Sequence, residues 1–89
     1  MIRKKITIIN KLGLHARAAA KLVDRACRYG SEIQLKRDHQ VADAKSILDV
    51  MMLAASKGTD LELIINGEDE AEALKDIAAL IENRFGEAE

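Results

Sequence analysis

The sequence contains no proline and no tryptophan, and only one cysteine, one tyrosine and one phenylalanine among its 89 residues. A lone Cys27 cannot form an internal disulfide, and Cys27, His15 and His39 have neither the spacing nor the carboxylate support of a zinc site. Because aromatic side chains are this scarce and the net charge is −1, nothing favours base stacking or a basic nucleic-acid surface. We therefore expect no metal, no cofactor and no nucleic-acid partner.

Long apolar runs are also missing. The segment 1–6 carries basic residues but no apolar region long enough for a signal peptide, and no run approaches the length of a transmembrane helix. A chain of this length predicts a single domain, residues 1–89, that can bury one aliphatic core. We expect a cytoplasmic protein that does not insert into membranes and acts as a monomer.

Hydrophobic periodicity predicts four strands and three helices. Apolar residues alternate with polar ones at 2–9, 31–37, around 41 and at 60–66, which predicts strands. Apolar residues recur with helical spacing at 16–28, 46–55 and 71–85, and Gly30 and Gly58 are expected to mark where the first two helices end. The order βαββαβα predicts an α/β (α+β) sandwich with strands in one layer and helices in the other. The pattern alone does not choose between a ferredoxin-like arrangement and other split βαβ sandwiches.

The same periodicity predicts which helix faces are buried. In the middle helix, which has only one buried side, Ile47, Leu48, Met51 and Met52 cannot all face the core, so some are expected on the surface. The predicted buried positions of the first helix are Ala16, Ala19, Ala20, Val23, Ala26 and Cys27, and those of the last are Ala71, Leu74, Ile77, Ala78, Ile81 and Phe85.

His15 lies where a loop meets the predicted helix 16–28. The first N–H groups of a helix have no partners within it and the helix dipole is positive there, so an anion is stabilised. Imidazole accepts a phosphoryl group well, because one ring nitrogen is free and basic near neutral pH. Arg17 can add a side-chain contact to the anion, and Gly13 permits a tight turn and the close approach of a partner's backbone. These residues could support phosphoryl transfer without a metal.

Two segments resemble one known family. The run Asn10-Lys11-Leu12-Gly13-Leu14-His15-Ala16-Arg17 is similar to the active-site motif of HPr, the histidine-containing phosphocarrier of the phosphoenolpyruvate-dependent phosphotransferase system, and 44–59 resembles that family's regulatory serine segment with the helix after it. Element order and length match along essentially the whole chain. Two motifs in register are much more specific than either alone.

The resemblance implies an open-faced sandwich in which three helices cover one side of a four-stranded antiparallel sheet. It implies that enzyme I delivers the phosphoryl group from phosphoenolpyruvate and that enzyme IIA domains of the sugar or nitrogen branch receive it. The residue matching His15 would carry the group on Nδ1, against the N–H groups of Ala16 and Arg17. Such a phosphohistidine protein is a carrier within a transferase chain rather than an enzyme with its own substrate pocket.

Ser46 has two interpretations. Its hydroxyl suits the N-cap of the following helix, and the resemblance implies regulatory phosphorylation by a serine kinase, reversed by a phosphorylase. A phosphate would place a charge of about −2 beside the expected docking surface and weaken partner binding. That docking surface consists of Ala20, Ile47, Leu48 and Met51.

Some positions depart from the family pattern. Ala18 stands where proline is usual; it restores one N–H at the helix start and removes no group that the chemistry needs. Leu12 and Asp24 also depart from the family pattern, so the sequence does not decide whether the partners belong to the sugar branch or the nitrogen branch. Two alternative functions also stay open: a regulatory module of the same fold that acts through Ser46 without transfer at His15, and an unrelated ferredoxin-like ligand-binding or RNA-binding domain.

Overall fold

A computed structural model describes residues 1–88, and its element order is βαββαβα, as the sequence predicted. Within this range, no helix combines the length and the apolar character that crossing a bilayer requires. The strands are β1 (Ile2–Thr7), β2 (Glu32–Arg37), β3 (Gln40–Asp43) and β4 (Asp60–Asn66); the helices are α1 (Ala16–Ala26), α2 (Ile47–Met52) and α3 (Glu70–Glu82), and a 3-10 turn, η1 (Arg84–Gly86), follows α3.

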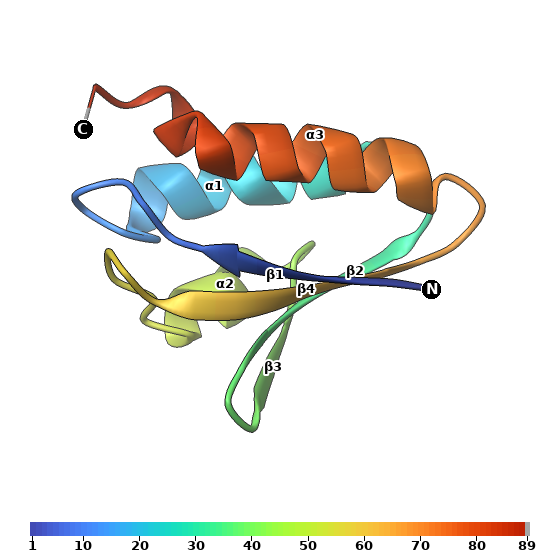
Figure 1. Cartoon of the computed structure of the whole chain (residues 1–89), viewed down its shortest axis with the longest axis horizontal. Helices are drawn as coiled ribbons and strands as arrows, with labels where there is room; N and C mark the ends of the chain where they lie inside the picture. The colour runs from blue at the N-terminus through green and yellow to red at the C-terminus, as the bar shows by residue number, and fades with distance from the viewer. Residues whose placement is uncertain (89) are drawn as a thin grey trace.

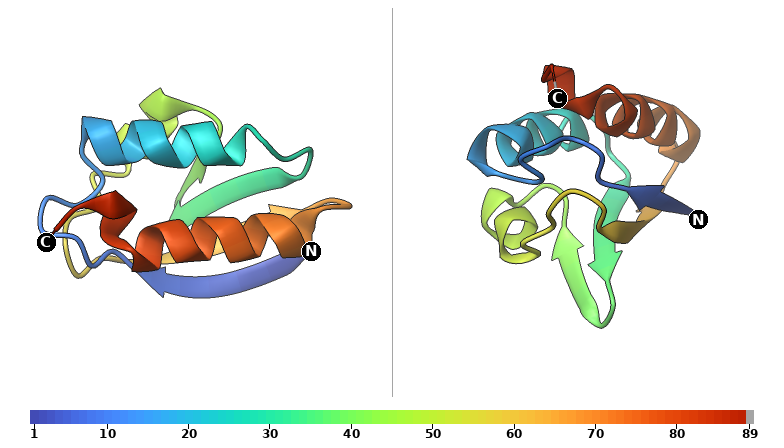
Figure 2. Two further views of the ribbon diagram at one scale, coloured as in Figure 1. Left: turned by 90° about the horizontal axis from the view of Figure 1, so that it is seen from above. Right: turned by 60° about the vertical axis from the view of Figure 1, so that its left-hand side comes forward.

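The four strands form one antiparallel sheet in the order β1-β4-β2-β3. The central pair is thus β4 and β2, whereas a ferredoxin-like sheet has its first and third strands at the centre, so the question that periodicity left open is decided. Helices α1 and α3 run side by side over one face of the sheet, and the N-terminus lies in the sheet layer at the start of β1 (Figure 1). The short α2 packs against α1 and β3, beside the edge of the sheet (Figure 2).

The buried face of α1 is rotated from the predicted one. Leu22 is fully buried, while Ala16, Ala20 and Cys27 are exposed. Burying a leucine removes more apolar area from water than burying an alanine, so the helix turns the face that carries Leu22 toward the sheet and leaves Ala16, Ala20 and Cys27 outside. The buried residues of α1 are Ala18, Ala19, Leu22 and Ala26.

The other helices also differ from the pattern in detail. Helix α2 ends at Met52, well before Gly58, and Ala54 adopts a positive φ of 51° after it. Helix α1 ends at Ala26 and does not reach Gly30. In α3, Ala71 is exposed, and Phe85 is buried but lies in η1 with a positive φ of 55° rather than in the helix. The buried residues of α3 are Ala73, Ile77, Ala78, Leu80 and Ile81.

A polar contact ties the two long helices together. The carboxylate of Asp76 on α3 accepts hydrogen bonds from Nη1 of Arg25 and from the hydroxyl of Tyr29, each at 2.6 Å. The Tyr29 hydroxyl, followed by the Arg25 guanidinium, holds the pKa of Asp76 below its usual value, and the same hydrogen bond raises the pKa of Tyr29. This contact fixes α1, and therefore the residue at its start, relative to α3.

Candidate functional site

His15 is the N-cap of α1. Its backbone is extended, with φ −74° and ψ 176°, and its Nδ1 accepts a hydrogen bond from the N–H of Arg17 at 3.3 Å. The N–H of Ala19 is the one that reaches the His15 carbonyl, at 2.8 Å. The earlier N–H groups of α1 therefore point out of the helix end, in the direction of the imidazole.

The loop before His15 is held by the segment that follows α2. The N–H of Leu14 donates to the carbonyl of Ala55 at 2.8 Å. Gly13 has a φ of +68°, and a Cβ there would lie 2.5 Å from the Ala55 oxygen and 2.8 Å from Cα of Ser56. The close approach that this glycine permits in the structure is to the chain's own backbone. This contact sets where α1, and His15 with it, begins.

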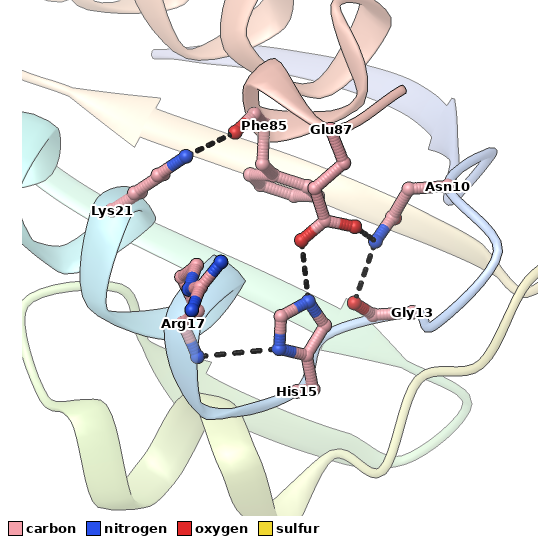
Figure 3. A network of polar contacts seen from close by, with 7 residues as sticks. All are labelled: Asn10, Gly13, His15, Arg17, Lys21, Phe85 and Glu87. Atoms are coloured by element: carbon pink, nitrogen blue, oxygen red, sulfur yellow. Dashed lines mark hydrogen bonds and ion pairs between the residues drawn. The ribbon is translucent and has the colours of Figure 1, made fainter. Parts of the chain in front are cut away.

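The second ring nitrogen of His15 faces a carboxylate from the other end of the chain. Nε2 lies 2.5 Å from Oε2 of Glu87, which follows η1 (Figure 3). Lys21 on α1 holds η1 in place because its Nζ donates to the Phe85 carbonyl at 2.6 Å. The side chains of His15 and Glu87 are 28% and 17% exposed, so this pair is shielded from water more than a surface ion pair.

Asn10, in the loop between β1 and α1, is the third residue of this cluster. Its side chain is fully buried, and its Nδ2 donates both to the Gly13 carbonyl at 2.8 Å and to Oε1 of Glu87 at 3.0 Å. The hydrogen bond from Asn10, followed by that from His15, holds the pKa of Glu87 below its usual value. The Oδ1 of Asn10 has no hydrogen-bond partner among the described residues, which costs about 1–3 kcal/mol for a buried acceptor.

The contributions of Asn10 and Glu87 to this site could not be predicted from the sequence pattern. Glu87 is separated from His15 by 72 residues and from Asn10 by 77, so no helical or strand periodicity connects them. The local pattern also predicted Phe85 within a regular helix, which would have carried the following residues away from α1. The bend at η1 is what returns Glu87 to the imidazole.

The three residues predicted for the phosphate site lie together. His15, Ala16 and Arg17 line one open hollow at the start of α1, together with Lys11, Leu12, Glu87 and Ala88. Leu12 is 67% exposed at its rim. The hollow thus combines an imidazole, first-turn amides and two cationic side chains, an arrangement that suits an anion transiently attached to the ring.

Ser46 is the N-cap of α2, as predicted from the pattern. Its Oγ accepts from the N–H of Asp49 at 3.3 Å. The carboxylate of Asp49 accepts from the N–H of Asp43, while the N–H of Ser46 donates to the carbonyl of Asp43, so this cap is not a reciprocal capping box. The Ser46 side chain is half-buried.

An exposed apolar surface follows directly after Ser46. Ala20 of α1, proposed from sequence as part of the docking surface, is exposed on the helix against which α2 packs. The large apolar side chains of α2 that are exposed are Ile47, Leu48, Met51 and Met52, with exposed fractions of 44%, 68%, 42% and 64%.

Comparison with known proteins gives one consistent family. The family model described as the phosphorylation site of the PTS HPr component matches residues 2–83. The chain is 52% identical over 89 residues to the phosphocarrier protein HPr of Cupriavidus necator, covering 100% of both, and 57% identical over 86 residues to that of Pseudomonas aeruginosa, covering 96% of each. A crystal structure of HPr from Thermoanaerobacter tengcongensis superimposes with a TM-score of 0.96, at 43% identity and with both chains covered completely.

Proposed function

Because the chain belongs to the HPr family of phosphocarriers of the phosphotransferase system, we propose that His15 is the residue on which it carries the phosphoryl group. Members of this family are carrier components and not catalytic enzymes. Membership in the family implies that enzyme I is the donor of the phosphoryl group and that enzyme IIA proteins are its acceptors. The contact that supports His15 most directly is the hydrogen bond from the N–H of Arg17 to its Nδ1 at 3.3 Å. A nitrogen that accepts this bond carries a lone pair, and a lone pair is what attacks phosphorus.

Nδ1 would take the phosphoryl group by direct displacement. The Nδ1–P bond forms as the bond between phosphorus and the donor's nitrogen breaks, and the electron pair of that bond stays with the donor. Phosphoryl transfer needs mainly positioning and charge stabilisation. The N–H of Arg17, freed from the ring lone pair, would donate to a phosphate oxygen, and the N–H of Ala16 lies beside it at the positive helix end.

The Arg17 side chain would supply the second contact to the phosphate. It lines the same hollow as His15, and a guanidinium donates charge-assisted hydrogen bonds to phosphate oxygens. Each group assigned to the reaction comes from the same chain, so a monomer is sufficient as the working unit. We place this unit in the cytoplasm, where the family's soluble partners act.

Docking and regulation would use the neighbouring helix. Ile47, Leu48 and Met51 are exposed on α2, and together with Ala20 they would form an apolar surface beside the phosphate site for enzyme I and for IIA proteins. The Ser46 hydroxyl lies at the start of that surface. Phosphorylation there would add about −2 charge next to apolar side chains and weaken docking, which is the second function we propose, for Ser46.

Labelling with phosphoenolpyruvate tests the assignment of His15. The protein is incubated with enzyme I, Mg²⁺ and phosphoenolpyruvate, and the label is examined for stability in acid and base. We expect an acid-labile, base-stable phosphate on the wild type and on His39→Ala, because His39 is exposed in the turn between β2 and β3. The His15→Ala variant should carry none. Label retained on His15→Ala, or absent from the wild type, would overturn the assignment.

A further inference from the structure

Two hydrogen-bond donors meet at Glu87. Nδ2 of Asn10 donates to Oε1 at 3.0 Å, and Nε2 of His15 lies 2.5 Å from Oε2. Since Nδ1 of His15 accepts from the N–H of Arg17, the proton of the neutral ring is on Nε2, and Nε2 is the donor to Glu87. A carboxylate can accept both hydrogen bonds, whereas an amide has only one oxygen and would turn an NH₂ group toward one of the two donors.

We propose that Glu87 is a positioning residue that keeps the proton on Nε2 of His15 throughout transfer, and that Asn10 holds the Glu87 carboxylate in place for this purpose. This inference rests on the phosphorylation of His15 proposed above. It adds a role for two residues that do not touch the phosphoryl group and act only through the far side of the imidazole ring.

The role follows from the charge that develops on the ring. When Nδ1 uses its lone pair to form the bond to phosphorus, the ring becomes cationic as long as Nε2 keeps its proton. The carboxylate of Glu87 compensates that charge at the nitrogen opposite the phosphate. In the onward step a lone pair of the acceptor forms a bond to phosphorus as the Nδ1–P bond breaks, and the electron pair of the broken bond returns to Nδ1, so the ring leaves as neutral imidazole. Without the Nε2 proton it would have to leave as an anion, which is a much poorer leaving group.

The surroundings support a role specific to this carboxylate. The charged groups that face the pair are Lys21 and Arg17 from α1 and Lys11 from the loop before it. All three are cationic, so Glu87 is the one anionic side chain that the described residues bring to the ring. The buried amide of Asn10 fixes its orientation, since both N–H groups of that amide are directed, one to Glu87 and one to the Gly13 carbonyl.

Hydrolysis of the phosphorylated protein tests this role. The wild type, Glu87→Gln, Glu87→Ala and the control Glu82→Gln are labelled through enzyme I, freed of it, and followed between pH 6 and pH 10. Glu82 is exposed at the end of α3, and its variant should reproduce the wild-type profile. We expect hydrolysis to slow with rising pH, because a phosphorylated ring without its Nε2 proton would have to leave as an anion. For both Glu87 variants we expect this decline to begin about one pH unit lower, which makes hydrolysis roughly tenfold slower on the declining limb.

A second readout uses the unphosphorylated protein. The Nε2–H proton of His15 should give a downfield NMR resonance in the wild type and in Glu82→Gln, and this resonance should be lost in Glu87→Ala. If Glu87 only anchors the chain end, the Gln variant, which keeps its size and one hydrogen bond, will show the wild-type hydrolysis profile, and the inference is overturned. If the wild type takes no label on His15, the proposed function itself fails. The two failures are therefore distinguishable.

Discussion

The backbone of Gly13 lies against the carbonyl of Ala55, so closely that a Cβ at position 13 would stand 2.5 Å from its oxygen. The N–H of the next residue, Leu14, donates to the same carbonyl at 2.8 Å. The loop that presents His15 is therefore held against the segment after α2, and the proposed phosphate site and the proposed docking helix are linked through backbone atoms.

Replacing Gly13 by alanine should destabilise the protein by about 2–4 kcal/mol. The φ of +68° is strained for an alanine, and the added methyl group forces backbone atoms apart. Urea denaturation measures the loss. Gly30 is the matched control, because no atom of the described residues 1–88, apart from its chain neighbours, lies within 4 Å of its Cβ position. Gly30→Ala should change the unfolding free energy by less than about 0.5 kcal/mol. Equal effects of the two substitutions would contradict the packing argument.

Replacing Arg17 by alanine should slow phosphoryl transfer from phospho-enzyme I roughly ten- to hundredfold. This loss is smaller than that of a donor in a closed active site, because Arg17 is exposed. Rapid-quench labelling measures the rate. The control is Arg28→Ala, which removes an exposed arginine that pairs with Asp24 near the other end of α1, and its rate should be that of the wild type. A normal rate for the Arg17 variant would remove this residue from the site.

Replacing Leu48 by alanine should weaken the complex with enzyme I without affecting the fold. Leu48 is 68% exposed, and losing its contact at an interface would cost about 1–2 kcal/mol, a roughly five- to thirtyfold higher dissociation constant. Calorimetric titration with enzyme I measures it. Lys75→Ala is the control, since Lys75 is exposed on α3, whereas α2 packs against α1 and β3. If both variants bind like the wild type, the docking surface lies elsewhere.

Three substitutions at Ser46 separate the helix-capping role of the side chain from the effect of a negative charge on docking. Ser46→Ala should lose about 1 kcal/mol of stability, because no side chain then accepts from the N–H of Asp49, with little effect on transfer. Ser46→Asn should keep both stability and transfer. Ser46→Asp should keep the helix cap but raise the KM of enzyme I for this protein, since the substitution places a negative charge beside Ile47 and Leu48. If the Asn and Asp variants have the same KM, charge at this position does not regulate docking.

Asp69 should make stability depend on pH in the acid range. Its pKa lies below the usual value, chiefly because the Ser31 hydroxyl donates to its carboxylate, with a further hydrogen bond from the N–H of Gly30 at 2.9 Å. A lowered pKa in the folded state contributes stability above the unfolded value of about 3.9, which is lost as pH falls through the folded value. The unfolding free energy, measured in urea, should therefore decline below about pH 4.

The variants at Asp69 and its neighbour check this assignment. Asp69→Asn should be less stable than the wild type at pH 7 and should depend less on pH between 4 and 2, because the titrating carboxylate is gone. Glu68→Gln is the control, since Glu68 is exposed one residue earlier, and its curve should follow that of the wild type. An Asp69→Asn curve parallel to the wild type would mean that other carboxylates cause the acid instability.

The local features of this protein follow from its amino-acid sequence alone. β4 has the predicted bounds, Ser46 caps α2, and His15 lies where α1 begins, because each of these depends on residues a few positions apart. Strand and helix periodicities encode such spacings directly. The resemblance to HPr extended these local features to a family and to its partners.

The contacts between residues far apart in the chain depend on the tertiary structure. Which face of α1 is buried depended on where the sheet could receive Leu22, and the end of the last helix depended on packing Phe85 in η1. The same bend returns Glu87 to His15, and the close contact between Gly13 and Ala55 sets the start of α1. These pairs are far apart in the chain, and nothing in the residues between them encodes their approach. Only the packing of helices on the sheet brings them together, so His15 could be predicted from its neighbours but the groups behind its ring could not.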